Sequence, residues 1–182
     1  LRDLSMPSVR FEVRLLSREG KNALSASGAD EVSFVMSANA GEALGPISRI
    51  ASGGELSRIM LALKNVFAEK DGVDALIFDE IDTGVSGVAA QRVAEKLASL
   101  GRTKQVLCVT HLPQIAAMAQ QQYLVEKAEH GGRTYTNIRL LDREGRRYEL
   151  ARLSGGDMIT DIQLAGAEEL LARDERFRAS LS

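Results

Sequence analysis

The sequence predicts an α/β fold in which helices cover a parallel sheet core and an antiparallel β region precedes that core. Residues 9–15 alternate apolar and polar side chains, which is the period of a half-buried strand, and residues 32–36 are typical of a second strand. Short apolar runs at 75–78 and 106–109 are each followed by helical periodicity, the strand–helix–strand–helix pattern of parallel packing. An apolar fraction of 45% in 182 residues suffices for one aliphatic core.

The first part of the chain is expected to be mostly β structure. Residues 1–6 are amphipathic, and Pro7 stops any helix there. A turn at 20–22 and a loop at 25–30 separate the two strands, and residues 41–48 are expected to be irregular.

The rest of the chain alternates strands and helices. Apolar residues recur at helical spacing after Ser52, and Asp71-Gly72 is expected to end that helix. The strands at 75–78 and 106–109 are continuous apolar runs, so we expect them to be buried on both faces. The further predicted elements are a loop at 84–87, a helix at 90–100, a helix from Pro113 to about residue 119, a hairpin of 122–128 with 134–141, a turn at 143–145 and a helix at 160–173.

Composition and charge exclude several classes of protein. A net charge of −2 and a pI near 5.8 argue against a generally basic nucleic-acid surface. Arg143, Arg146 and Arg147 are diluted by nearby glutamates, so a solvated turn is expected there. No apolar stretch approaches the ~20 residues of a membrane span. The single Cys108 lies in an apolar run, which favours buried packing and a reducing compartment.

Two glycines stand at the start of the helix that follows Ser52, in the string Ser52-Gly53-Gly54-Glu55. A capping box explains Ser52 and Glu55 but not the glycines, each of which costs up to about 1 kcal/mol relative to alanine in a helix. A helix N-terminus with bare N–H groups is a ready anion site, and glycines let a phosphate approach it. From the residues alone, both interpretations stay open.

Two carboxylates, Asp79 and Glu80, directly follow the apolar run at 75–78. Carboxylates at the end of a buried strand are costly unless a metal ion or hydrogen bonds meet them. Mg²⁺ uses one or two carboxylates together with substrate phosphates. We therefore assign Asp79 to Mg²⁺ and Glu80 to polarising an attacking water. The alternative is a solvated strand end.

His111 follows the second apolar run and is expected at the same edge of the sheet as the carboxylates, where ligands gather in parallel sheets. We assign it to the γ-phosphate, although a lone histidine is more often structural. His130, in a glycine-rich turn, is expected to be only solvated. Asp82 either shapes a loop that meets a neighbouring subunit or forms an Asx turn.

One essential part of a nucleotide site is missing from the sequence. No G-x-x-x-x-G-K-[ST] loop occurs, so the chain supplies a γ-phosphate contact, a metal carboxylate and a base, but no cradle for the α- and β-phosphates. A partner segment should provide it. A second Ser-Gly-Gly string at 153–157 is followed by no strand with terminal carboxylates, so it predicts a turn before the last helix.

Together these residues resemble the C-terminal lobe of an ABC-type ATPase head, with a signature motif at 52–55, a Walker B strand at 75–80, a D-loop from Asp82 and a switch histidine at His111. The longer stretches at 50–64, 78–87 and 109–116 are similar to the RecN family, bacterial SMC-like ATPases of DNA double-strand-break repair. The string at 153–157 also looks like that family. The D-loop departs from the usual transporter form at Thr83-Gly84-Val85.

The resemblance implies a domain organisation and a set of roles. Residues 1–7 would be the stump of a coiled-coil helix, and residues 8–182 the C-terminal lobe of the head; a start at Leu1 instead of Met suggests a fragment. ATP and Mg²⁺ are the implied cofactors. The implied site residues are Glu80 and His111 for catalysis, Asp79 for the metal, and Ser52, Gly53, Gly54, Glu55 and Asp82 for the nucleotide.

The resemblance also implies partners and a place of action. The partners are the N-terminal Walker A lobe of the same protein, a second head in a homodimer, and double-strand DNA ends, in the bacterial cytoplasm at the nucleoid and away from membranes. The favoured hypothesis is an ATPase head that is inactive without the Walker A lobe. The alternatives are a nucleotide-gated dimerisation module with little turnover, and a head lobe of another SMC-like chromosome-maintenance protein.

Overall fold

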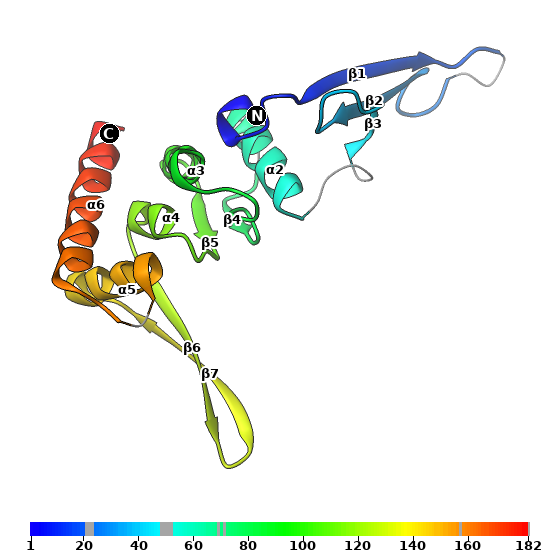
Figure 1. Cartoon of the computed structure of the whole chain (residues 1–182). Coiled ribbons are helices and arrows are strands. Elements are labelled where there is room, and N and C mark those ends of the chain that lie inside the picture. Colours follow the sequence, from blue (N-terminus) through cyan, green and yellow to red (C-terminus); the bar gives the residue numbers. More distant parts are fainter. Residues whose placement is uncertain (21–23, 48–52, 69, 71, 157, 182) are drawn as a thin grey trace.

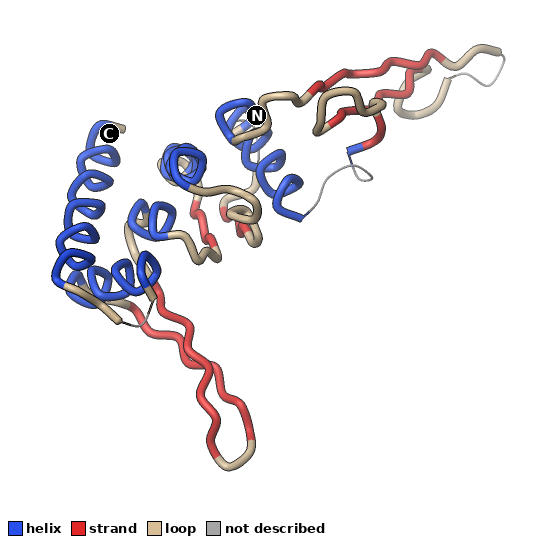
Figure 2. Tube along the Cα trace, viewed as in Figure 1, coloured by secondary structure: helices blue, strands red, loops and turns tan. Residues whose placement is uncertain are grey.

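The computed structural model describes residues 1–20, 24–47, 53–68, 70, 72–156 and 158–181, and forms a helical body from which two β arms extend (Figures 1 and 2). The predicted α/β class is confirmed: an N-terminal antiparallel sheet precedes a parallel strand pair that helices cover on one face. The elements are η1 (Arg2–Leu4), β1 (Arg10–Ser17), β2 (Asp30–Ser37), β3 (Gly45–Pro46), α2 (Gly53–Phe67), β4 (Ala75–Phe78), α3 (Gly87–Leu100), β5 (Gln105–Cys108), α4 (Pro113–Met118), β6 (Tyr123–His130), β7 (Arg133–Leu140), α5 (Arg143–Gly155) and α6 (Asp161–Ser180).

The N-terminal sheet has the order β1-β2-β3 and forms the first arm. β1 and β2 are antiparallel, from Arg10 opposite Ser37 to Ser17 opposite Asp30. The segment expected to be irregular contains the short strand β3, which pairs with β2 and accepts Pro46 because an edge strand tolerates a missing N–H group. Met36 at the base of β2 is fully buried against Ile59 of α2, which joins the arm to the body.

The parallel pair β4–β5 forms the centre of the body, with Phe78 of β4 opposite Cys108 of β5. The expectation that both faces of these strands are buried is wrong. Side chains alternate between the faces of a strand, and Phe78 packs into the core while the Ile77 side chain is 74% exposed and Leu107 is also exposed. Among the described residues, helices cover only one face of this pair.

The main core joins the covered face of the strands to helices α2, α3 and α4. Its α3 residues recur at helical spacing, which explains why the periodicity at 90–100 predicted this helix correctly. The buried members are Leu4, Leu61, Phe78, Ile81, Val93, Ala94, Leu97, Leu100, Ile115 and Met118.

The second arm is the predicted hairpin of β6 and β7 (Figure 1). Its strands pair from Tyr123 opposite Leu140 to His130 opposite Arg133. Gly131 and Gly132 connect them with φ values of +58° and +72°, which a two-residue hairpin turn requires and which glycine adopts without strain.

Helix α5 corrects the prediction of a turn at 143–145. Asp142 caps the helix by accepting a 2.8 Å hydrogen bond from the Gly145 N–H group. The helical pattern is obscured in the sequence because two charged residues, Arg146 and Glu149, are among the side chains that the helix buries.

The chain turns between α5 and α6, as the second Ser-Gly-Gly string predicted. Ser154 and Gly155 end α5, and Gly156 follows with a φ of +82°. Asp157 lies outside the described residues, as does Asp71, which was expected to end α2. Helix α6 begins with a capping box between Thr160 and Gln163 and is longer than predicted.

Arginines from α5 and α6 hold the C-terminal end of α4. Arg146, expected in a solvated turn, is 9% exposed, and its Nη2 donates to the carbonyl oxygens of Ala117 at 3.1 Å and Ala119 at 2.8 Å. Arg178 donates to the Met118 carbonyl oxygen at 2.9 Å. The last carbonyls of a helix have no partners within it, so these guanidinium groups satisfy them and fix α4 to the last two helices.

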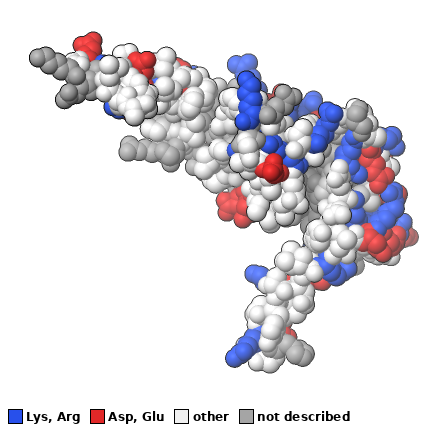
Figure 3. All heavy atoms as spheres, turned by 180° about the vertical axis from the view of Figure 1, so that it is seen from behind, with Lys and Arg blue, Asp and Glu red and all other residues white. Residues whose placement is uncertain are grey.

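Charges of both signs are interspersed over the helical body (Figure 3). This view shows no extended face covered by lysine and arginine alone, in keeping with the net charge of −2. Within the part of the chain that the structure describes, no helix has the length and apolar character to cross a membrane.

Candidate functional site

The carboxyl ends of β4 and β5 bring the predicted site residues together. The strands are parallel and in register, and the Val109 N–H group donates to the Phe78 carbonyl oxygen at 2.9 Å just beyond their ends. Asp79 and Glu80 leave β4 at this edge, and His111 follows β5 at the same edge. The fold therefore brings the two predicted motifs together at one edge of the sheet. Helix α2 contributes a third part of the site.

The first turn of α2 lies directly against the turn formed by residues 80–83. A Cβ atom built at Gly54 would lie 2.8 Å from the Thr83 Cβ and 3.0 Å from the carbonyl oxygens of Glu80 and Thr83. The bare backbone at Gly54 is thus required by the chain's own turn, an explanation that the sequence did not offer. Ser52, predicted to contact nucleotide, lies outside the described residues.

Glu80 stands at the start of α2 in an unusual backbone conformation. Its φ of +57° is left-handed, which is uncommon for a residue with a side chain and is found where surrounding structure imposes it. A Cβ at Gly53 would overlap with Glu80 Oε2, so the carboxylate occupies the space beside the first residue of α2. The proposed base and the proposed anion site therefore lie side by side within one chain.

Helix α2 also holds the carboxylate turn through two side chains. Ser57 Oγ donates to the Asp79 carbonyl oxygen at 2.7 Å. Arg58, which is 6% exposed, donates from Nη1 to the carbonyl oxygens of Thr83 at 2.7 Å and Ile81 at 3.4 Å. Burial lowers the pKa of the Arg58 guanidinium, and the Glu55 carboxylate opposes this.

No specific role was predicted for Arg58, although its position in the sequence carries a signal. Arg58 follows the buried Gly54 by four positions and precedes the buried Leu61 by three, so it lies on the buried face of α2. A charged residue at such a position needs a polar partner inside the protein. The backbone carbonyls of the carboxylate turn supply that partner.

Asp82 links the two strand ends. It is 5% exposed, and its Oδ2 accepts hydrogen bonds from Thr110 Oγ1 at 2.6 Å and from the His111 N–H group at 2.9 Å. The His111 Nδ1 lies 3.0 Å from the same oxygen, and the His111 side chain is 73% exposed. The Asx-turn interpretation is wrong, because the carboxylate reaches residues of the next strand's loop instead of its own turn.

Asp79 suits the role of a metal ligand that acts together with a bound phosphate. Its Oδ1 accepts a hydrogen bond from the Glu80 N–H group at 2.9 Å, which orients the carboxylate at the edge of the sheet. Among the described residues no group of three or more His, Cys, Asp or Glu side chains is arranged to hold a metal ion. One exposed carboxylate matches Mg²⁺, which completes its shell with waters and substrate phosphates.

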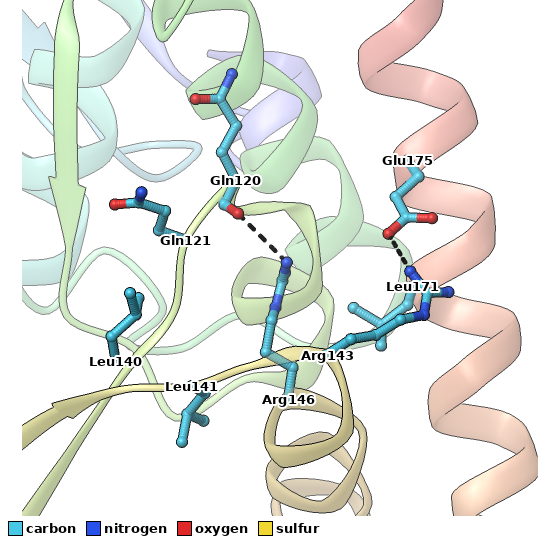
Figure 4. A pocket seen from close by; sticks show the side chains of 8 residues that line it. All are labelled: Gln120, Gln121, Leu140, Leu141, Arg143, Arg146, Leu171 and Glu175. Atoms are coloured by element: carbon cyan, nitrogen blue, oxygen red, sulfur yellow. Dashed lines mark hydrogen bonds and ion pairs between the residues drawn. The ribbon is translucent and has the colours of Figure 1, made fainter.

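A pocket of about 230 Å³ lies elsewhere, between the end of α4, β7, α5 and α6 (Figure 4). Arg146 and Arg143 line it; Arg146 Nη1 donates to the Gln120 carbonyl oxygen at 3.4 Å, and Arg143 pairs with Glu175 at 2.7 Å. None of the predicted site residues lines this pocket. The candidate site is instead an open edge of the sheet.

Comparison with known proteins gives relatives along nearly the whole chain. The DNA repair protein RecN of Halalkalibacterium halodurans is 46% identical over 172 residues, which is 94% of this chain and 30% of that protein. RecN of Treponema pallidum is 46% identical over 181 residues, and RecN of Bacillus subtilis is 41% identical over 178 residues. The chain spans about 30% of the length of the curated relatives it matches. No protein-family model matches it.

Two solved structures show a weaker likeness. One belongs to a study of ATP-driven dimerization and DNA-stimulated activation of SMC ATPases; it is 18% identical, covers 86% of this chain and 89% of that chain, and has a TM-score of 0.47. The other is an SMC head bound to the C-terminal winged-helix domain of ScpA; it is 22% identical, covers 78% of this chain and 40% of that chain, and has a TM-score of 0.46.

Proposed function

We propose that this chain, which is homologous over nearly its whole length to the RecN DNA repair proteins, is the C-terminal lobe of an ABC-type ATPase head. In this proposal residues 8–182 form the lobe and residues 1–7 end a coiled-coil helix. The lobe contributes half of a composite ATP site, and ATP binding joins two heads. Hydrolysis then releases them, and the full protein couples this cycle to DNA double-strand ends in the bacterial cytoplasm.

One observation carries the proposal: the start of α2, the Asp79–Glu80 pair and His111 share one edge of the parallel strands. A helix N-terminus offers N–H groups to a phosphate, a carboxylate holds Mg²⁺, a second carboxylate serves as base, and an imidazole contacts developing charge. The sequence contains no G-x-x-x-x-G-K-[ST] loop. An N-terminal lobe of the same protein therefore has to supply the phosphate cradle.

The proposed reaction is in-line attack of water on the γ-phosphate. Glu80 orients the water and accepts its proton, while the His111 ring of the same head and the α2 N–H groups of the second head contact the phosphate oxygens, whose charge they stabilise. Asp79 would hold Mg²⁺, which neutralises phosphate charge when it is bound. In a head dimer, Ser52, Gly53, Gly54 and Glu55 of one head would face the nucleotide on the other, so each site needs both heads.

A second function, a nucleotide-gated dimerisation module with little turnover, is favoured by one feature of Glu80. Its carboxylate lies beside Gly53, where the nucleotide of the opposite head would approach. Hydrolysis therefore requires Glu80 to leave this place and turn toward the nucleotide of its own head, and a chain in which it stays there would bind nucleotide and hydrolyse it slowly. The homology to RecN argues against a head of another SMC-like protein.

The test is steady-state ATP hydrolysis by this chain alone and after mixing with a RecN segment that carries the missing loop. We expect turnover only in the mixture, and a loss of about 10²- to 10⁴-fold with Glu80→Gln because a positioned base is removed. Glu129→Gln, on the exposed hairpin, should leave turnover unchanged. Comparable turnover by the chain alone would refute the composite site. Little effect of Glu80→Gln would support the gated module.

A further inference from the structure

The pair formed by Asp82 and His111 joins the loops that follow β4 and β5. We infer that Asp82 is the positioning residue of His111: its carboxylate fixes the imidazole so that Nε2 is the nitrogen presented to the nucleotide. The inference rests on the proposed function, since it names the residue that orients a contact of that site. The resemblance placed Asp82 among the nucleotide-binding residues, whereas its contacts place it behind the histidine.

The geometry gives the carboxylate one orientation. Asp82 Oδ2 is close to three donors, which are Thr110 Oγ1 at 2.6 Å, the His111 N–H group at 2.9 Å and His111 Nδ1 at 3.0 Å. Rotation of the carboxylate would break the contacts to Thr110 and to the His111 backbone together. The ring therefore lies against an acceptor that is already fixed.

The loop that carries Asp82 is itself held from the other side. Arg58 donates to the Thr83 carbonyl oxygen at 2.7 Å, and the Val85 N–H group donates to the Asp82 carbonyl oxygen at 3.2 Å. On the histidine side, Thr110 Oγ1 accepts from the Leu112 N–H group at 3.1 Å. Both loops are thus anchored by contacts that do not involve the imidazole ring.

The chemistry of the pair decides which ring nitrogen is presented. An ionised carboxylate only accepts hydrogen bonds, so Nδ1 carries a proton whenever it contacts Asp82. The partner of one ring nitrogen determines the state of the other. In the neutral ring, Nε2 then has a free lone pair that accepts a hydrogen bond from water. In the charged ring, Nε2 donates to a phosphate oxygen, and Asp82 balances the charge from behind.

Because the His111 ring is largely exposed, its contact with Asp82 has a large effect on its orientation. The His111 side chain is 73% exposed and Asp82 is 5% exposed, so one partner is anchored and the other stands in solvent. Ordering an exposed side chain costs conformational entropy. Without Asp82, the ring would sample several rotamers and both neutral tautomers, and a smaller fraction would present Nε2 to the nucleotide.

The direct test is the ¹⁵N NMR spectrum of the imidazole rings, recorded on this chain without nucleotide at a pH where the rings are neutral. The chain has two histidines, and His130→Gln assigns the signals. We expect the Nδ1–H tautomer to dominate for His111 in the wild type and to become a minority with Asp82→Ala, which removes the acceptor; Asp82→Asn would keep an amide oxygen facing the same donors. Thr110→Val removes a neighbouring donor without touching the ring and should keep the Nδ1–H tautomer.

Two results would overturn the inference. One is a dominant Nε2–H tautomer in the wild type, a result that needs no variant and so remains decisive if Asp82→Ala fails to fold. The other is an unchanged tautomer in a folded Asp82→Ala. Asp74→Ala, which removes an exposed carboxylate before β4, is the matched control and should leave the spectrum of His111 unaltered.

An activity measurement separates this inference from the proposed function. In the mixture that hydrolyses ATP, Asp82→Ala should lower turnover at least about tenfold, approaching the loss with His111→Ala. Loss with His111→Ala but wild-type turnover with Asp82→Ala would refute the positioning role and leave the proposed function standing. Absence of hydrolysis in every mixture, together with the expected tautomer, would refute the proposed function and keep the geometry of the pair.

Discussion

Gly54 shows at the scale of one residue how the site is assembled. Its lack of a side chain lets the first turn of α2 touch the carbonyl groups of the turn at 80–83. The same absence leaves the N–H groups of the helix accessible to an anion. One residue therefore serves both the packing of the site and the proposed contact with phosphate, and stability measurements can isolate the first role.

We expect Gly54→Ala to destabilise the chain by about 1–3 kcal/mol in the absence of nucleotide, because overpacking against backbone atoms forces the elements apart. Gly166→Ala is the control. Its added methyl group meets nothing within 4 Å, so it should stabilise α6 by up to about 1 kcal/mol. Urea unfolding of both variants is the measurement. Unaltered stability of Gly54→Ala would show that the helix and the turn do not touch.

Cys108 gives a pH prediction at the same scale. Burial, and then the Asp82 and Asp79 carboxylates, raise the pKa of this thiol from 9.0 to about 12. The folded state holds the proton more tightly than the unfolded state, so the thiol's contribution to stability is full below pH 9.0 and is lost as the pH rises toward about 12. This also agrees with the expectation that Cys108 is a packing residue.

Stability should therefore fall more steeply in the wild type than in Cys108→Ala above pH 9.0, by a difference that approaches about 1.4 kcal/mol per pH unit. Urea unfolding at a series of alkaline pH values measures it, and the comparison cancels the lysines and tyrosines that titrate in both proteins. Parallel curves for the two proteins would mean that the thiol is not buried in the fold.

At the scale of elements, α4 depends on helices that follow it in the sequence. It is six residues long, shorter than an isolated helix needs to be stable, and Arg146 and Arg178 complete its C-terminal end. It begins two residues after His111, so the same contacts anchor the loop that carries the histidine. Helix α5, which the sequence pattern did not predict, therefore helps to hold the loop of His111 in place.

Arg146→Met should cost about 2–3 kcal/mol of unfolding free energy, because carbonyl groups at the end of α4 lose a charged donor. Arg147→Met is the matched control on the next residue. Arg147 pairs with Glu144 within α5, and such helix pairs contribute at most about 0.5 kcal/mol. Equal losses in the two variants, measured by urea unfolding, would contradict the proposed anchoring.

On the scale of the whole molecule, apolar side chains lie on strand faces that the described helices leave bare. On the first arm Phe11 and Phe34 stack at 5.8 Å between ring centroids, and both are exposed. Val125 and Ile138 on the hairpin and Ile77 in the parallel pair are exposed as well. Apolar faces of this kind are typical of surfaces that pack against further protein, in keeping with the proposed second lobe.

Neighbouring residues of β4 should therefore respond differently to truncation in this chain. Ile77→Ala removes a side chain that is 74% exposed and should cost less than about 0.5 kcal/mol, whereas Phe78→Ala empties a core position and should cost about 3–5 kcal/mol. Urea unfolding of the two variants measures both losses of unfolding free energy. A large loss with Ile77→Ala would show that the second face of the strand pair is covered within this chain.

The sequence by itself determined the elements whose pattern is local and the family to which the chain is related. Local patterns of apolar and turn residues predicted the strands other than β3, together with helices α2, α3, α4 and α6, because each pattern lies within one element. The resemblance to RecN is confirmed by relatives 41% to 46% identical. The roles assigned to Asp79, Glu80 and His111 stay predictions, although the fold gathers the three residues at one edge.

Only the tertiary structure decided the contacts between distant parts of the chain. Arg58 reaches Thr83 across 25 residues, and Asp82 reaches the His111 backbone across 29, so no local pattern contains them. The exposed face of β4 and the buried charges of α5 were missed for the same reason. Burial depends on what packs against an element, and a polar residue becomes an interior one when a distant backbone group satisfies its hydrogen bonds.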